Sequence, residues 1–136
     1  MNYFLAKSEP GVYSIDDLKR DHQTAWDGVT NAQAVKTIRA MRPGDRVFIY
    51  HSGGVSAVVG LAMVKIAPRD DPRNPKSAIV DLEYRAHIDP PVTLAEIKQS
   101  GQFDDWPLIR QGRLSTMPAP QKFVEWLREK RPKANI

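Results

Sequence analysis

The sequence predicts an α+β fold, in which a small mixed β-barrel of about five or six strands is surrounded by helices. Apolar and polar residues alternate over residues 80–88, which is the clearest sign of a strand. Residues 55–66 form an apolar run long enough for one buried strand or two. A stripe at helical spacing consists of Ala34, Val35, Ile38 and Met41. Because 136 residues with 41% hydrophobic content can fill one core, we expect one domain over residues 1–136.

The start of the chain predicts a strand, a turn and a helix. Residues 3–7 are suited to a short strand, which the turn-forming residues 8–11 end. Ser14 and Asp17 stand three positions apart, and each side chain can bond the backbone N–H of the other. This pair is therefore the N-terminal signature of a brief helix.

A second strand and a second helix follow. Residues 23–26 have an extended pattern, and Gly28 interrupts the chain after them. Asn31 is suited to cap the helix that carries the apolar stripe. The Pro-Gly-Asp sequence of residues 43–45 ends this helix.

The rest of the chain alternates strands with short helices. Residues 46–52 have a β-like pattern, whereas residues 68–77 are rich in Pro, Asp, Arg and Asn and predict a mobile surface loop. Thr93 and Glu96 form a second capping box. A final helix ends at Pro132, and its apolar stripe consists of Phe123, Val124 and Leu127.

The composition narrows the classes of function. Cysteine is absent, which excludes disulfides, thiolate zinc sites and a cysteine nucleophile. The three histidines are scattered, at positions 22, 51 and 87, so we expect neither a metal nor another cofactor. A net charge of +4 permits a polyanionic partner without demanding one.

No apolar run approaches the roughly 20 residues that a membrane span requires. Residues 1–5 lack the basic start of a secretory signal. We therefore expect a cytoplasmic protein without a membrane partner, and we expect it to be a monomer.

Two polar motifs lie at predicted strand ends. The first places a cation, a hydroxyl and a carboxylate before a turn, and it consists of Lys7, Ser8, Glu9 and Pro10. The second runs from Trp26 through Asp27 and a glycine to Asn31. An indole at a strand end can stack on a base, which is worth ~1–3 kcal/mol. Alternatively, the first motif is a solvated turn, Trp26 fills the core and Asn31 only caps its helix.

Two later motifs also combine polar side chains. One ends a strand before two glycines, which let a ligand or another backbone approach, and it consists of Tyr50, His51 and Ser52. The other places a cation near a hydroxyl, in the segment Arg113, Leu114 and Ser115. A structural role is the alternative for both. Familiar hydrolase, kinase and dinucleotide-binding motifs are absent, so no catalytic residue is predicted.

Taken in order, these motifs closely resemble the EVE family. The resemblance also includes Gly28, Val29, Gly44, Asp45 and Gly60, and it extends from Tyr3 to the C-terminal helix. EVE domains have the PUA-like fold, an open β-barrel with flanking helices. They are relatives of the YTH domains, which bind methylated adenine in RNA. The resemblance therefore implies that residues 1–136 form an EVE (PUA-like) domain.

The resemblance implies a pocket for a flipped-out modified nucleobase, chiefly a modified cytosine in DNA, with a modified RNA base as the other ligand. Trp26 would be an aromatic wall of this pocket. The base edge would meet Ser8, Asn31 and the backbone of Asp27. Further ligand-binding residues would be Lys7, Tyr50, His51, Ser52, Leu114 and Ser115. Phosphates would be held by a set of cations that could instead form a solvated face, namely Lys36, Arg39, Arg42, Arg110 and Arg113.

Three positions depart from the family pattern. Thr30 and Ala32 stand where family members usually carry an arginine and a bulkier residue. Ser77 lies near a position where many members have tryptophan. We therefore expect a phosphate contact and part of one wall to be missing, which affects which base binds and not the fold.

An enzyme is the second interpretation. ASCH proteins, a related PUA-like family, include amidohydrolases that act on acetylated cytidine through a lysine and a glutamate. Lys7 and Glu9 could mimic that pair if their side chains converge in the pocket. A protein-interaction module is a third interpretation, but it leaves the polar motifs without a role.

Overall fold

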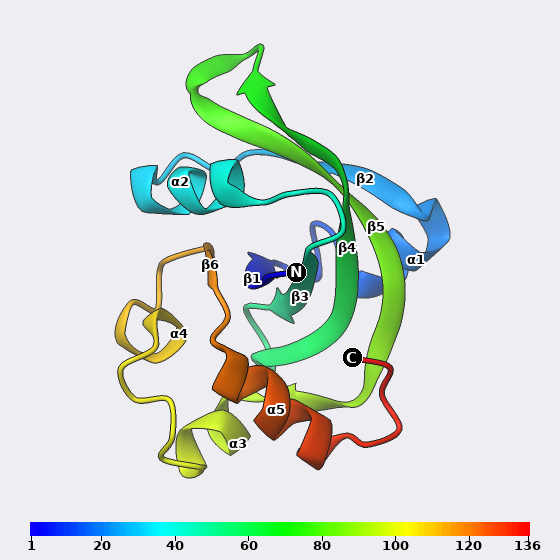
Figure 1. Cartoon of the computed structure of the whole chain (residues 1–136), viewed down its shortest axis with the longest axis vertical. Coiled ribbons are helices and arrows are strands. Elements are labelled where there is room, and N and C mark those ends of the chain that lie inside the picture. The colour runs from blue at the N-terminus through cyan, green and yellow to red at the C-terminus, as the bar shows by residue number, and fades with distance from the viewer.

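The computed structural model describes residues 1–136 and contains one six-stranded mixed sheet with five helices around it (Figure 1). The strands are β1 (Tyr3–Ser8), β2 (Gln23–Trp26), β3 (Arg46–His51), β4 (Ala57–Asp71), β5 (Asn74–Thr93) and β6 (Thr116–Pro118). The helices are α1 (Ile15–Asp21), α2 (Ala32–Ala40), α3 (Leu94–Gln99), α4 (Pro107–Arg110) and α5 (Gln121–Lys130). The predicted α+β class is confirmed.

The sheet has the strand order β2-β5-β4-β3-β1-β6. Of its strand pairs, β1 with β3 is parallel and the others are antiparallel. The sheet curls around the core but does not close, because β2 and β6 are edge strands that do not pair with each other (Figure 1). The expectation of an open PUA-like barrel is therefore confirmed.

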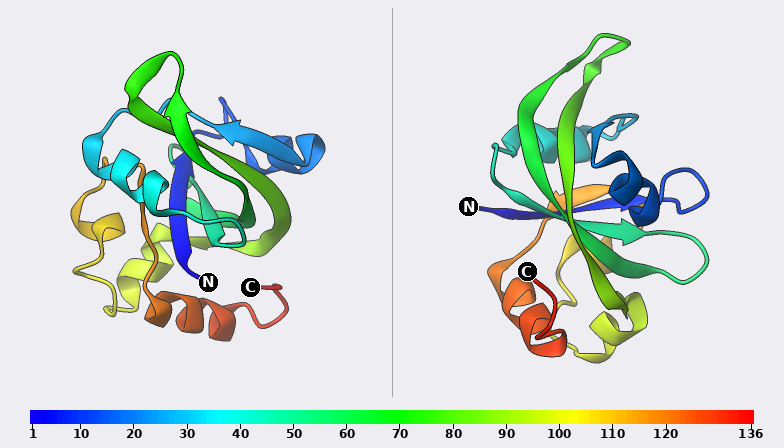
Figure 2. Two further views of the ribbon diagram at one scale, coloured as in Figure 1. Left: turned by 45° about the horizontal axis from the view of Figure 1, so that its top comes forward. Right: turned by 90° about the vertical axis from the view of Figure 1, so that its right-hand side faces the viewer.

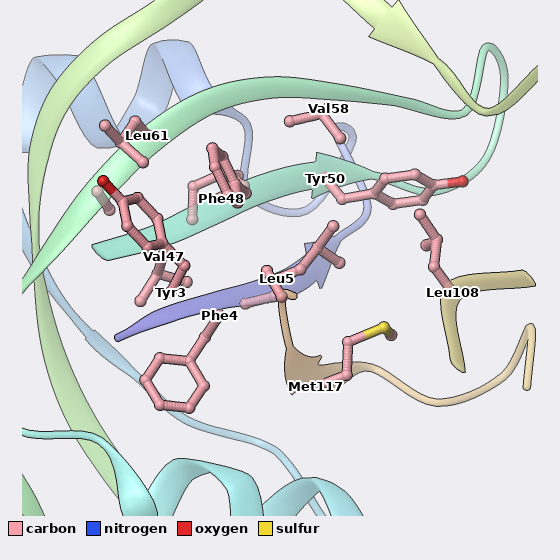
Figure 3. Packing of buried hydrophobic residues seen from close by; sticks show 14 of the residues in the cluster. Tyr3, Phe4, Leu5, Val47, Phe48, Tyr50, Val58, Leu61, Leu108 and Met117 are labelled. Carbon is pink, nitrogen blue, oxygen red and sulfur yellow. The ribbon is translucent and has the colours of Figure 1, made fainter. Parts of the chain in front are cut away.

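One continuous core of 38 buried apolar residues fills the inside of the curled sheet. Leu5, Phe48 and Met117 bring β1, β3 and β6 together in this core (Figure 3). The ring of Phe123, from α5, lies 5.5 Å from that of Phe48 and 4.6 Å from that of Trp106. Aromatic packing therefore fixes the C-terminal helix to the sheet.

The predicted helix starts are confirmed, although one box is incomplete. Asp17 N–H donates to Ser14 Oγ at 3.1 Å, and Ser14 N–H donates to the Asp17 carboxylate at 2.9 Å. Thr93 Oγ1 accepts a bond from Glu96 N–H at 3.1 Å, as predicted. The Glu96 carboxylate does not reach back to Thr93, since it forms an ion pair of 3.2 Å with Arg131.

The predicted mobile loop over residues 68–77 is wrong. β4 and β5 continue through this segment as a two-stranded arm that projects from the sheet (Figure 2). Arg69 of this arm forms an ion pair of 2.9 Å with Asp81 across the two strands. Pro68 is tolerated because it lies where the register shifts between Ile66 and Arg69, so its missing N–H disrupts no regular pairing.

The start of the first helix approaches β4 closely, because Gly60 leaves room for the Ile15 side chain. A Cβ at Gly60 would collide with the side chain of Ile15. The sequence patterns predicted neither α4 nor β6, and three residues are too few for alternation to reveal β6. None of the five helices is long and apolar enough to cross a membrane.

Candidate functional site

A cavity of about 550 Å³ lies between the end of β1 and the end of β2, and we call it the Trp26 cavity. Small-molecule sites typically have volumes of about 300–1,000 Å³. Three segments line the cavity: the end of β1 with the following turn, β2 with its loop to α2, and the loop before β6. The lining residues are Lys7, Ser8, Val12, Tyr13, Thr24, Ala25, Trp26, Asp27, Gly28, Val29, Thr30, Asn31, Arg113 and Ser115.

An aromatic pair forms one wall of the Trp26 cavity. Trp26 is the last residue of β2, and only 9% of it is exposed. Tyr13 meets it edge-on, with ring centroids 6.3 Å apart and an interplanar angle of 82°. The Tyr13 hydroxyl donates a hydrogen bond of 2.9 Å to the Asp21 carboxylate. Burial raises the pKa of Tyr13, so the phenol keeps the proton that this bond requires.

Backbone and side-chain bonds fix the end of β1. Lys7 N–H donates to the Ser115 carbonyl at 2.8 Å, which joins β1 to the loop before β6. Ser8 Oγ donates to the Tyr13 carbonyl at 2.6 Å. Because the Ser8 proton is used in this bond, its hydroxyl oxygen can act toward a ligand only as an acceptor.

The Lys7 side chain is held at the rim of the cavity. Its ammonium group donates to the Gly112 carbonyl at 2.9 Å and lies 5.5 Å from the centroid of the Tyr50 ring. Desolvation by burial lowers the pKa of Lys7. An anion beside this ammonium group would oppose that effect by favouring its charged form.

The loop after Trp26 is fixed at both ends. Gly28 has a φ of +76°, a conformation that other residues rarely adopt. The buried Ser77 hydroxyl donates to the Val29 carbonyl and so anchors the loop to β5. At the start of α2, Asn31 Oδ1 accepts a bond of 3.1 Å from Ala34 N–H. This cap uses the amide oxygen of Asn31 and leaves its two amide N–H groups as free donors.

Six of the ten predicted ligand-binding residues line the cavity, namely Lys7, Ser8, Trp26, Asp27, Asn31 and Ser115. Tyr50 and Leu114 do not line it. Tyr50 is 3% exposed and packs in the core, where it lies near Leu108 (Figure 3). Leu114 is also a buried core residue. Tyr50 and Leu114, predicted as ligand-binding residues, are thus packed in the core and do not face this cavity.

His51, the last residue of β3, and Ser52, which follows it, also lie outside the lining. His51 Nε2 accepts a bond of 3.1 Å from Ile15 N–H at the start of α1. The pKa of His51 is lowered, mainly by burial. Ser52 N–H donates to the Ser8 carbonyl at 3.0 Å. Both residues therefore support the segments that line the cavity.

Of the five predicted phosphate-binding residues, only Arg113 lines the cavity. Arg39 forms an ion pair of 2.8 Å with Asp70, and Arg42 donates to backbone carbonyls at the end of its own helix. These two guanidinium groups are thus engaged within the chain. Lys36 and Arg110 are exposed outside the cavity, and neither forms an ion pair.

Lys7 and Glu9 do not converge in the cavity. Glu9 is exposed, does not belong to the lining, and uses its carbonyl to accept bonds from the N–H groups of Val12 and Tyr13 at 2.9 Å each. Lys7 bonds to Gly112 instead. The convergence of Lys7 and Glu9 on which the amidohydrolase alternative depends is therefore not seen in this structure.

Several lining residues were not predicted from the sequence. Tyr13 is the most informative, since it supports Trp26. Its only sequence signal is an aromatic residue directly before the helix cap Ser14. The other lining residues that were missed as site residues are Val12, Thr24, Ala25, Gly28, Val29 and Thr30.

Comparison with known proteins relates the whole fold to one family. Residues 2–130 match the family model of the EVE domain. Thymocyte nuclear protein 1 from Homo sapiens is 32% identical over an alignment that covers 96% of this chain and 76% of that protein. The NMR structure of Rpa0253 from Rhodopseudomonas palustris has a TM-score of 0.91 at 32% identity, covering 100% of this chain and 97% of that chain.

Two further solved structures are similar to this chain. The crystal structure of human THYN1 protein in complex with DNA that contains 5-methylcytosine has a TM-score of 0.87 at 28% identity, covering 98% of this chain and 99% of that chain. An ASCH protein from Zymomonas mobilis has a TM-score of 0.54 at 12% identity, covering 92% of this chain and 98% of that chain. The second likeness concerns the fold alone.

Proposed function

Because the chain belongs to the EVE domain family, we propose that it binds DNA that carries a modified cytosine, without catalysing a reaction. The modified base would leave the stack and enter the Trp26 cavity. The aromatic wall of Trp26 and Tyr13, beside free polar groups, is the observation that carries the proposal. The complex of human THYN1 with DNA that contains 5-methylcytosine supports the choice of ligand.

Trp26 supplies the stacking surface in this proposal. Stacking of a base on an aromatic side chain contributes ~1–3 kcal/mol. Removing a base from the duplex costs a few kcal/mol, so stacking can offset much of that cost. Every base has a flat face, however, and stacking alone cannot select cytosine. Selection must come from the edge of the base.

The free donors and acceptors of the cavity complement the edge of cytosine. Ser8 offers an acceptor, since its proton is bonded to the Tyr13 carbonyl. Asn31 offers amide donors, since its oxygen caps α2. Cytosine presents an amino donor beside ring acceptors, which matches this pair, whereas thymine presents a carbonyl at the same place as the amino group. Ala25 and Val29 line the same cavity and provide apolar surface for a 5-methyl group.

Two cations at the cavity are suited to hold the phosphates on either side of the base. Lys7 and Arg113 both line it, and Arg113 has no ion-pair partner in the chain. Arg113→Gln should weaken binding and reduce the magnitude of the salt slope by about 1. Arg85→Gln is the matched control, because Arg85 is exposed on β5 outside the cavity.

Titration of three single-stranded oligonucleotides that differ at one base tests the proposal. The variable base is 5-methylcytosine, cytosine or thymine. Cytosine lacks only the methyl group, while thymine keeps the methyl group and changes the edge. We expect 5-methylcytosine to bind most tightly and thymine to bind about tenfold more weakly, the effect of one mismatched hydrogen-bond partner.

Equal affinity for the three strands would refute base recognition in this cavity. The same titration with RNA strands tests whether the ligand is DNA or RNA. Tighter binding of a modified RNA strand than of the DNA strand would identify RNA as the ligand. Chromatography of the bases after incubation tests catalysis, and an altered base would contradict a binding function without catalysis.

A further inference from the structure

The turn between β1 and α1 carries an unusually exposed apolar side chain. Val12 is 77% exposed, yet it also lines the Trp26 cavity. The other large apolar lining residues differ from it, because Trp26 and Val29 are buried in the wall and Tyr13 is partly buried. Val12 is thus the large apolar side chain that projects into solvent at the mouth of the cavity.

We propose that Val12 is a wedge that fills the gap left in a DNA duplex when the modified base turns into the Trp26 cavity. This inference rests on the proposed function. A flipped base rotates about its own backbone, so the gap lies within one nucleotide of the pocket that receives the base. The group that fills the gap must therefore stand at the mouth of that pocket, as Val12 does. Apolar side chains inserted between base steps are a common device of proteins that distort DNA.

The turn that carries Val12 is held in place by hydrogen bonds. The N–H groups of Val12 and Tyr13 both donate to the Glu9 carbonyl at 2.9 Å. Ser8 Oγ closes the turn by its bond of 2.6 Å to the Tyr13 carbonyl. The next residue, Tyr13, packs edge-on against Trp26. Val12 and the stacking surface of Trp26 are therefore fixed relative to each other. A preorganised side chain loses little conformational freedom on insertion.

Val55 provides a matched control on a neighbouring turn. It is 75% exposed and lies between β3 and β4, but it does not line the cavity. The bond from Ser52 N–H to the Ser8 carbonyl, 3.0 Å long, joins the starts of the two turns. In the right-hand view of Figure 2 the two turns project from the same edge of the molecule. Val12 and Val55 thus share exposure and chemistry and differ in their relation to the cavity.

The test compares one 5-methylcytosine strand in two forms, paired in a duplex and alone, by fluorescence anisotropy. Val12→Ser should weaken binding of the duplex about tenfold, because the gap is no longer filled, and change binding of the single strand less than about twofold. Val12→Leu should retain duplex affinity. Val55→Ser should bind both forms as the unaltered protein does.

The remaining outcomes contradict either the wedge role of Val12 or the proposed function. If Val12→Ser binds the duplex as tightly as the unaltered protein, the wedge is refuted while the base-binding function stands. An equal loss on duplex and single strand also refutes the wedge, since Val12 would then contact the bound base as part of the wall. If the unaltered protein does not prefer 5-methylcytosine in either form, the proposed function itself fails.

Discussion

Two regions of this molecule each bury a tryptophan to a similar degree but differ in what surrounds it. The C-terminal aromatic cluster consists of Phe103, Trp106, Phe123 and Trp126, whose rings pack on one another at centroid distances of 4.6 to 6.0 Å. Trp26, by contrast, has an aromatic neighbour on one side, Tyr13, and the cavity on another. Trp26 is 9% exposed and Trp106 is 5% exposed.

The exposed fraction therefore does not distinguish a tryptophan of the core from one that lines a cavity. The groups that surround the indole ring distinguish the two. In the cluster, the Trp106 indole N–H also bonds to the Pro118 carbonyl at 2.9 Å, so both its apolar and its polar surface are satisfied within the chain. At the Trp26 cavity, Ser8 and Asn31 keep unused bonding groups. Substitutions in the two regions should therefore have different effects on stability and on binding.

The largest effect is expected in the cluster. Phe123 is 0% exposed and packs between Phe48, Trp106 and other aromatic rings. Phe123→Ala should lower the free energy of unfolding by ~3–5 kcal/mol, since it leaves a cavity in the core. Denaturant unfolding measures this loss. A change below about 1 kcal/mol would contradict the role of the cluster in fixing α5.

The next effect is expected at the cavity and concerns binding alone. Asn31→Ser keeps a side-chain oxygen for the cap of α2 but removes the amide donors. Affinity for a 5-methylcytosine strand should fall about tenfold, while the free energy of unfolding changes by only a few tenths of a kcal/mol. Thr93→Ser, at the cap of α3, is the control and should change neither property. Unchanged affinity of Asn31→Ser would exclude Asn31 as an edge contact.

The smallest effect is a pH dependence at His51, which supports the start of α1. Burial lowers the pKa of His51 from its usual 6.5, while the charge of Asp16 opposes this shift and His87 adds to it. The unfolded state therefore takes up the proton at higher pH than the folded state. Stability from this group is complete above 6.5 and is lost as pH falls through the lower pKa of the folded state.

Thermal unfolding between about pH 7.5 and pH 5 measures that loss. His51→Gln keeps a group that can accept a hydrogen bond from the N–H of Ile15 but does not titrate. As the pH is lowered, the melting temperature of this variant should therefore fall less than that of the unaltered protein. His87→Gln serves as a control for the nearby pair of His87 and Asp16, which lie 2.7 Å apart. Parallel pH curves for the unaltered protein and His51→Gln would show that His51 has no such role.

Local signals predicted the helix starts because a cap depends on residues within one turn. Ser14 and Asn31 accept the bonds that their spacing predicted. The arm of residues 68–77 was missed for the opposite reason. Its strands are fixed by pairing across β4 and β5 and by the ion pair of Arg69 with Asp81, and its polar composition resembles that of a loop.

The cavity was predicted in part, because strand ends could be located but their neighbours could not. Lys7, Ser8 and Trp26 stand at the ends of β1 and β2, and these ends meet at the cavity. Tyr50 also stands near a strand end, beside Lys7 on the paired strand β1, but its ring is buried in the core. The sequence contains no signal for this pairing. Family resemblance supplied the set of residues, and three-dimensional packing selected among them.

A paired measurement on Trp26→Ala and Trp106→Ala tests whether the Trp26 cavity is the site of the base. For both variants, affinity for a 5-methylcytosine strand and the free energy of unfolding are measured in parallel, with Trp26→Phe as an intermediate. The two alanine variants should show opposite losses. Trp26→Ala should lose affinity by roughly 10- to 100-fold and remain folded, with Trp26→Phe retaining part of the affinity.

Trp106→Ala should instead lose ~3–5 kcal/mol of stability, with affinity unchanged in the folded fraction. The contradictory result would be a Trp26→Ala variant that is destabilised as strongly as Trp106→Ala and binds the strand as tightly as the unaltered protein once folded. Trp26 would then be a residue of the core, and the Trp26 cavity would not be the site of the base.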